Sequence, residues 1–195
     1  MNFLAHFLLS GSDEEVIFGN FLGDFLKGNE IKDLSGSAAM GLELHRFIDR
    51  FTDQHPQVRN SVNTVKSEFG RYSGVVIDVY YDHILAKEWT EYQKANLRFF
   101  ADSMYQVLTD RVDLMPGRAL RFYHYMLTND ILYNYQFIEG ISLVFQGMSR
   151  RASFNSRMEL APELLVQYLE VIENDFRIFF PELVLECKEF IKTVR

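Results

Sequence analysis

Cysteine is almost absent from this 195-residue chain, in which Cys187 is the only one. A lone cysteine can form neither a disulfide within the chain nor a cysteine-based zinc site, so we interpret it as a buried thiol in a late helix. The chain begins without the basic segment of a signal peptide, and no apolar run approaches the roughly 20 residues that span a bilayer. We therefore expect a cytoplasmic protein that does not insert into a membrane.

Positive charge is also scarce. The chain has 20 Lys and Arg residues against 27 Asp and Glu residues, which gives a net charge of −7. This excess of negative charge argues against general binding to nucleic acid or to an anionic membrane. An acidic partner would have to meet a local basic surface. The sequence leaves the oligomeric state open.

Proline is rare, and each of the four prolines lies where a helix could begin. Hydrophobic residues make up 48% of the chain and recur at helical spacing almost throughout. We therefore predict an all-α protein, with a single helical-bundle domain over residues 1–195. The expected helices cover residues 2–10, 12–28, 37–54, 56–69, 73–89, 90–110, 116–128, 130–147, 161–179 and 181–193, with a loop at 147–153.

The third predicted helix carries a cluster of polar side chains beside its apolar face. His45 and Asp49 are one helical turn apart and Asp53 is one turn further, while Arg46 and Arg50 form a neighbouring pair. An imidazole, two carboxylates and two guanidiniums could together hold a divalent metal and a phosphate. The alternative is a set of ordinary hydrogen bonds and ion pairs on a solvated helix surface.

The second predicted helix places a carboxylate, Asp24, among apolar neighbours. A buried carboxylate needs a partner, which could be a metal, an arginine or backbone donors. In the same helix Gly19 and Gly23 leave a strip without side chains, which another helix or a ligand can approach closely. The alternative is a structural contact between helices with an Asp–Arg pair.

Two further stretches have residues of the same kind. Asp78 and Asp82 are one turn apart, and His83 follows Asp82. Imidazole and carboxylate ligands together suit Mn²⁺, Fe²⁺ or Zn²⁺, whereas carboxylates alone suit Mg²⁺ or Ca²⁺. The alternative is a surface Asp–His pair. His6, in an apolar helix, is more typical of a hydrogen-bonded core histidine than of a ligand.

In their order along the chain these motifs resemble the acyl carrier protein phosphodiesterases. The resemblance rests on Asn2-Phe3-Leu4-Ala5-His6, Gly19-Asn20, Asp24-Phe25, Lys27-Gly28, the group His45, Arg46, Ile48, Asp49, Thr52 and Asp53, then Asp82-His83, and Gly147-Met148 with Arg151. The family is related to the all-helical HD-type metal phosphohydrolases, so the resemblance implies an HD-domain-like fold. Its members remove the 4′-phosphopantetheine arm from holo-acyl carrier protein (holo-ACP) with a divalent metal, typically Mn²⁺.

Together with the residue chemistry, the resemblance implies roles for individual side chains. The expected metal ligands are Asp24, His45, Asp49 and Asp82. The expected catalytic or supporting residues are His6, Asp53 and His83, which would orient imidazoles and move protons, and Arg46 and Arg50, which would hold the phosphate. The metal is expected to be Mn²⁺, with Mg²⁺, Fe²⁺ and Zn²⁺ as alternatives.

The expected function is hydrolysis of holo-ACP to apo-ACP by a metal-dependent phosphodiesterase. Two alternatives remain: an HD-like phosphohydrolase acting on a nucleotide or another small phosphodiester, and a non-catalytic helical module that binds a carrier protein. Acyl carrier proteins are acidic, so docking would need a local basic surface. The candidate cations are Arg59, Lys66, Arg71, Arg150, Arg151 and Arg157.

Overall fold

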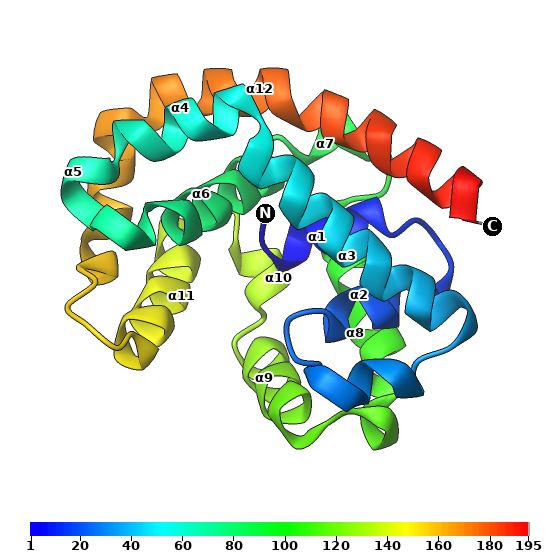
Figure 1. Ribbon diagram of the computed structural model, residues 1–195. Helices are drawn as coiled ribbons and strands as arrows, with labels where there is room; N and C mark the ends of the chain where they lie inside the picture. The colour runs from blue at the N-terminus through cyan, green and yellow to red at the C-terminus, as the bar shows by residue number, and fades with distance from the viewer. Residues whose placement is uncertain (195) are drawn as a thin grey trace.

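The computed structural model describes the backbone of residues 1–194 and the side chains of all of them except residues 29, 32, 33 and 194 (Figure 1). Within residues 1–194 the regular structure consists of α-helices and short 3₁₀ helices, and no strand occurs. The all-α prediction is therefore confirmed. None of these helices combines the length and the apolar character that a membrane crossing requires.

The helices follow one another with short connections. The α-helices are α1 (Phe3–Leu9), α2 (Glu14–Leu22), α3 (Gly36–Gln54), α4 (Pro56–Thr64), α5 (Lys66–Phe69), α6 (Ser73–Lys87), α7 (Trp89–Tyr92), α8 (Leu97–Thr109), α9 (Gly117–Thr128), α10 (Ile131–Asn134), α11 (Ile138–Arg151) and α12 (Ala161–Val194). The 3₁₀ helices are η1 (Gly28–Asp33), η2 (Gly70–Tyr72), η3 (Val112–Leu114) and η4 (Met158–Leu160).

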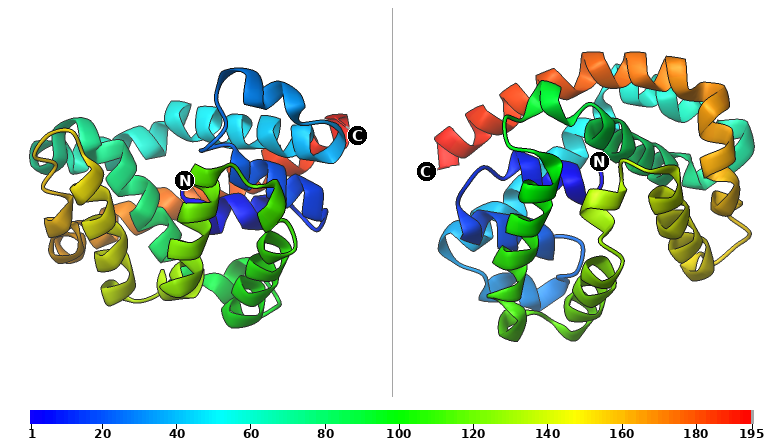
Figure 2. Two further views of the ribbon diagram at one scale, coloured as in Figure 1. Left: turned by 90° about the horizontal axis from the view of Figure 1, so that it is seen from below. Right: turned by 180° about the vertical axis from the view of Figure 1, so that it is seen from behind.

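The long helix α12 forms an arch over one side of the molecule, with α4 lying along it (Figure 1). Beneath the arch, α5 and α11 lie toward one end and α2, α8 and α9 toward the other. The N-terminus lies between these two groups. Two further views show the same separation (Figure 2). This arrangement leaves α1 at the centre of the molecule, where it contacts α2, α6 and α12.

Helix α6 forms the centre of the core. Its side chains from Val79 to Ala86 are all buried, and Tyr81 packs against Phe176 and Phe179 of α12 with ring centroids 5.2 and 5.6 Å apart. A helix buried on every side has an almost uniformly apolar sequence, with no amphipathic period. The run from Val75 to Tyr81 has a strand-like composition and is nevertheless helical, as predicted, because Val76, Ile77 and the residues from Val79 to Tyr81 are all buried.

Helices α2 and α3 pack with their backbones close together. A Cβ atom on Gly19 would lie 1.9 Å from the carbonyl oxygen of Ala38, and one on Gly41 would lie 2.2 Å from that of Val16. Only glycine permits so close an approach. The strip at Gly19 is therefore occupied by a neighbouring helix, which is one of the two predicted possibilities.

Several predicted helix ends are wrong. Helix α2 ends at Leu22, so Asp24 lies beyond it, and α11 continues to Arg151 through the predicted loop. Helix α12 runs without a break through Pro181, where a new helix was expected to begin. The predicted helices at 90–110 and 130–147 are each divided, by residues 93–96 and residues 135–137.

Candidate metal centre

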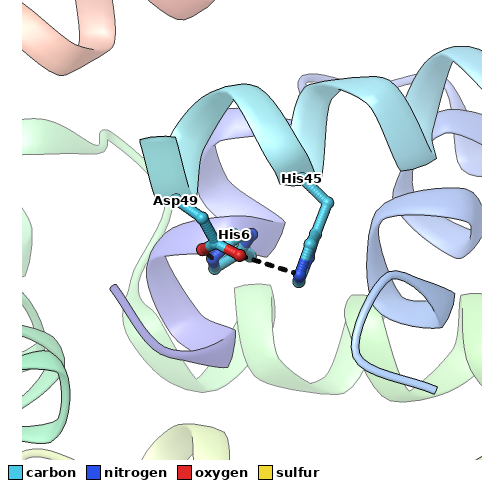
Figure 3. Close-up of side chains that lie close together, drawn as sticks. All are labelled: His6, His45 and Asp49. Carbon is cyan, nitrogen blue, oxygen red and sulfur yellow. Dashed lines mark ion pairs between the residues drawn. The ribbon is translucent and has the colours of Figure 1, made fainter. Parts of the chain in front are cut away.

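Two histidines and one aspartate from α1 and α3 converge on a single point (Figure 3). His6 Nε2 lies 3.2 Å from Asp49 Oδ1, and His45 Nε2 lies 3.2 Å from Asp49 Oδ2. The two imidazole rings face one another with centroids 4.4 Å apart. Both rings are buried, whereas about half of the Asp49 side chain is exposed (48%). The cluster therefore opens toward solvent on the side of the carboxylate.

Asn20 of α2 fixes the orientation of both rings. Its Oδ1 lies 2.8 Å from His6 Nδ1 and 3.1 Å from His45 Nδ1. Its Nδ2 donates to the carbonyl oxygen of His6 and to Ser10 Oγ, and this Oγ donates in turn to the His6 carbonyl. The amide of Asn20 is thus held with its oxygen toward the rings.

The orientation of this amide decides where each histidine carries its proton. An oxygen only accepts, so both Nδ1 atoms must donate to Asn20. In the neutral rings this leaves Nε2 without a proton and directed at Asp49. A histidine that donates from one nitrogen while presenting the other is the usual arrangement for a metal ligand.

Charge within the cluster shifts the pKa values of Asp49 and His45 in opposite directions. Burial alone would raise the pKa of Asp49, but hydrogen bonds from His45 and His6 outweigh it and hold that pKa well below its usual range. Burial alone would lower the pKa of His45, but Asp49 and Asp24 outweigh it and raise that pKa. The environment therefore favours an ionised carboxylate beside a positive charge.

A cavity of about 230 Å³ lies next to the cluster, lined by four carboxylates, the two histidines and Met1. The carboxylates belong to Asp24, Asp49, Asp53 and Asp78. Asp24 Oδ1 is 3.8 Å from His45 Nε2, and Asp78 Oδ1 is 2.7 Å from the amino group of Met1. Two imidazoles with several carboxylates form a donor set that suits Mn²⁺, Fe²⁺ or Zn²⁺. The residues present therefore fit a divalent metal.

The close position of His45 depends on a glycine. A Cβ atom on Gly23 would lie 2.3 Å from Cγ of the His45 ring. Gly23 has a φ of −53°, which any residue adopts, so glycine is needed here for space and not for backbone freedom. Asp24 follows directly, and its side chain is about half exposed (51%). The expected burial of Asp24 is therefore wrong, because the chain has left α2 before this residue.

The structure does not bring Asp82 to this cluster. Its carboxylate is fully buried on α6 and accepts hydrogen bonds from the backbone N–H groups of Asn2, Leu4 and Ala5, at 3.2, 2.7 and 3.4 Å. Asp82 thus holds the beginning of α1, the helix that carries His6. The expected group of four ligands has to be corrected, because His6 is beside His45 and Asp49 where Asp82 was expected.

Three other predicted residues also lie outside the cluster. His83 is buried on α6, where its Nδ1 donates to the carbonyl oxygen of Tyr135 at 2.6 Å, and burial lowers its pKa. Arg46 is exposed and pairs with Glu43 at 2.6 Å. Arg50 is exposed and is not among the residues that line the cavity. Of the predicted supporting residues, His6 and Asp53 do face the cavity.

Sequence reasoning gave no role to Asn20, although the motif Gly19-Asn20 was part of the resemblance. A signal was available, because Asn20 is a polar residue between Phe18 and Phe21 on the apolar face of a helix. A buried amide must find hydrogen-bond partners. Which partners it finds depends on where α1 and α3 pack, and local spacing does not contain that information.

Comparisons with known proteins agree with one another. The family model described as "Acyl carrier protein phosphodiesterase" matches residues 1–183. Curated proteins of that name from Escherichia coli O139:H28 (strain E24377A / ETEC), O9:H4 (strain HS) and strain K12 / DH10B are each 30% identical over 190 residues. Each alignment covers 96% of this chain and 97% of the relative. No solved structure matches the chain significantly.

Proposed function

Because this chain belongs to the acyl carrier protein phosphodiesterase family, we propose that it hydrolyses the phosphodiester between the 4′-phosphopantetheine arm and a serine of holo-ACP. The products are apo-ACP and 4′-phosphopantetheine. One observation supports this chemistry above the others: His6, His45 and Asp49 present their free ligand atoms to one acid-lined cavity. A phosphodiester is anionic and the four carboxylates of the cavity would repel it, so a divalent cation held between them would favour its binding.

We propose His6, His45, Asp49 and Asp24 as the residues that hold this divalent metal, with Mn²⁺ as the first candidate and Mg²⁺, Fe²⁺ or Zn²⁺ as alternatives. Such a metal supplies a Lewis acid, which neutralises phosphoryl charge and lowers the pKa of water. The imidazole donors favour Mn²⁺, Fe²⁺ or Zn²⁺ over Mg²⁺. Asn20 serves both histidines by accepting from their Nδ1 atoms, so that each ring in its neutral form directs an unprotonated Nε2 at the cavity.

In the proposed reaction a water oxygen adds to phosphorus and the bond from phosphorus to the serine oxygen breaks. The water loses a proton, and the serine oxygen takes one up. We assign the transient acceptance of this proton to the carboxylate of Asp53, which lines the cavity and is exposed. The hydrogen bonds from Asn2 and Leu4 to Asp82 anchor the beginning of α1, the helix that carries His6, to α6.

The acidic carrier protein is the proposed protein substrate, and its docking surface is still a prediction. Several of the expected cations already have neighbours: Arg157 lies 3.6 Å from Glu68, Arg71 stacks over Phe154, and Arg59 donates to the carbonyl oxygen of Asp53. Arg151 lines a groove beside the cavity. A cytoplasmic location likewise remains a proposal.

The proposal can be tested by mass spectrometry of the carrier. The protein, purified without chelator, is incubated with holo-ACP and Mn²⁺, and the mass of ACP should fall by that of the phosphopantetheinyl group. His45→Ala should abolish this change while the helix content stays the same. Cyclic nucleotides and other small phosphodiesters are assayed in parallel. Cleavage of a nucleotide with holo-ACP left intact would overturn the proposal in favour of a nucleotide phosphohydrolase.

A further inference from the structure

A larger groove, of about 620 Å³, continues from the cavity and shares Met1, Asp24 and Asp78 with it. Its outer walls are formed by α9 and α11, which both lie below the N-terminus in the view of Figure 1. We propose that this groove binds the pantetheine arm of the substrate while the phosphodiester lies at the metal centre. This inference rests on the proposed function, because it specifies how the substrate of that reaction is held.

The position and the size of the groove fit such an arm. Cavity and groove adjoin at Asp24 and Asp78, which line both, so the groove is the adjacent space for an arm attached to a phosphate in the cavity. The arm leaves the phosphorus on the side away from the serine and therefore extends away from the carrier protein. The volume lies within the range of about 300–1,000 Å³ that is usual for small-molecule sites.

One wall of the groove is aromatic. The rings of Phe3 and Phe25 pack against Phe122 with centroids 4.6 and 5.4 Å apart. Val75 of α6 and Met148 of α11 also line the groove. Together these side chains offer apolar surface to the dimethyl group and the methylenes of pantetheine. Burial of those groups removes apolar surface from water and so favours binding.

Polar donors also line the groove. The guanidiniums of Arg118 and Arg121 come from α9, and that of Arg151 comes from α11. Tyr125 also lines the groove, but its hydroxyl donates to the carbonyl oxygen of Leu143. Arg118 is partly engaged, because it bonds to the carbonyl oxygen of Phe25 and to Glu30. The pantetheine arm alternates methylenes with two amides and a hydroxyl, which accept hydrogen bonds from such donors. An apolar wall with arginine donors therefore complements this arm.

The test uses a substitution that narrows the groove at Val75, a residue whose side chain is 40% exposed. Val75→Trp places an indole in the groove without entering the core. The matched control is Val171→Trp, since Val171 is also helical and 45% exposed but lies on α12, outside the groove. Thermal unfolding of both variants shows whether either one is damaged.

Two measurements are made on each protein in the presence of Mn²⁺. Steady-state kinetics compare holo-ACP with bis(p-nitrophenyl) phosphate, a small phosphodiester that has no arm. Calorimetry compares the binding of 4′-phosphopantetheine with that of inorganic phosphate. We expect Val75→Trp to raise the KM for holo-ACP at least about tenfold more than the KM for the small phosphodiester. It should also remove the preference for 4′-phosphopantetheine over phosphate, while Val171→Trp behaves as the wild type.

The outcomes separate this inference from the proposed function. If holo-ACP is hydrolysed and Val75→Trp, folded, behaves like Val171→Trp in both measurements, the groove assignment is overturned and the function stands. If holo-ACP is not hydrolysed, the proposed function fails. In that case tight binding of 4′-phosphopantetheine that Val75→Trp abolishes still supports the groove, and binding no tighter than that of phosphate overturns it.

Discussion

Asn20 is the residue on which the candidate metal centre depends most. It is fully buried and accepts hydrogen bonds from both histidines through one oxygen atom. Asn20→Ala removes this acceptor and leaves two imidazole N–H groups without a partner. Loss of such a supporting hydrogen bond typically lowers metal affinity or activity about 10- to 100-fold. We expect a decrease of that size in Mn²⁺ affinity measured by calorimetry.

Nitrogen NMR of the imidazoles gives a second measurement on the same variant. In the metal-free wild type at high pH, His6 and His45 should both appear as the Nδ1–H tautomer. In Asn20→Ala they should appear as mixtures. Ser10→Ala is the milder control, because it removes only the hydroxyl that orients the amide. Unchanged tautomers and unchanged metal affinity in Asn20→Ala would refute the role given to this side chain.

Gly23 offers a test of how closely His45 must be held. Gly23→Ala adds a Cβ atom 2.3 Å from Cγ of the ring, so the imidazole has to move. We expect activity on holo-ACP to fall by more than tenfold and the free energy of unfolding to fall by about 1–3 kcal/mol. Gly74→Ala is the matched control. That position has no atom within 4 Å of an added Cβ, so alanine there should change stability by no more than about 1 kcal/mol.

Part of the site could be predicted residue by residue. His45 and Asp49 are i,i+4 neighbours, so their meeting follows from the geometry of one helix. Asp82 is also one turn from Asp78 in a helix, but the two carboxylates have different partners in the structure. Asp82 is turned to the beginning of α1, and that contact joins residues about 80 positions apart. No local pattern contains a contact of that kind.

At the scale of the element, α1 is held in place by a carboxylate from another helix. Burial raises the pKa of Asp82 to about 7, although the Met1 amino group and three backbone donors lower it. The native state therefore keeps a proton that the unfolded state, with a pKa near 3.8, has lost. Protons then favour the folded form, so the stabilising contribution of Asp82 is complete below about pH 4 and is lost as the pH rises toward 7.

The direction of this pH dependence can be measured by comparing the wild type with Asp82→Asn, whose side chain does not titrate. Urea unfolding of the wild type and of the variant is followed between pH 4 and pH 8. The free energy of unfolding of the wild type should fall relative to that of Asp82→Asn by an amount on the order of a few kcal/mol over this range. A difference that stays constant with pH, or rises, would show that Asp82 is ionised throughout.

The errors in predicting helix ends have particular causes. Gly147 was expected to mark a loop, but a Cβ atom there would lie 3.1 Å from the Tyr125 hydroxyl, so this glycine makes room for a neighbour. Pro181 was expected to begin a helix. In the structure Phe179, Phe180 and Leu183 are buried on both sides of it. Tertiary packing there outweighs the cost of a proline inside a helix, which removes a backbone hydrogen bond and often destabilises the helix by about 3 kcal/mol.

At the scale of the whole molecule, a metal at this site would join α1 to α3. A ligand that binds the folded state alone stabilises it by about 2.7 kcal/mol when its free concentration is about 100 times its Kd. Removing the metal with a chelator should therefore lower the Tm by several degrees. Restoring Mn²⁺ should reverse this shift. The measurement is thermal unfolding followed by circular dichroism.

Asp49→Asn supplies the control for this experiment, because it removes the carboxylate that both histidines contact. Its Tm should not respond to Mn²⁺ or to the chelator. If the wild type shows no response either, and metal analysis finds none bound, the cluster is a buried polar network and not a metal centre. A variant that does not fold at all would also favour that structural role.

The metal centre and the outer walls of the groove beside it come from different stretches of the chain, although the inner part of the groove shares Met1, Asp24 and Asp78 with the metal cavity. His6, Asn20, His45 and Asp49 all precede residue 50, whereas the outer walls of the groove come from residues 118–151. Changes in α9 and α11 that keep the contacts of Phe122 and Arg118 with Phe25 can therefore accumulate without altering the metal ligands. In terms of evolution, relatives of this chain can diverge in the substrate they accept by varying α9 and α11 while they inherit the same chemistry. A designer could exchange those two helices for the same purpose.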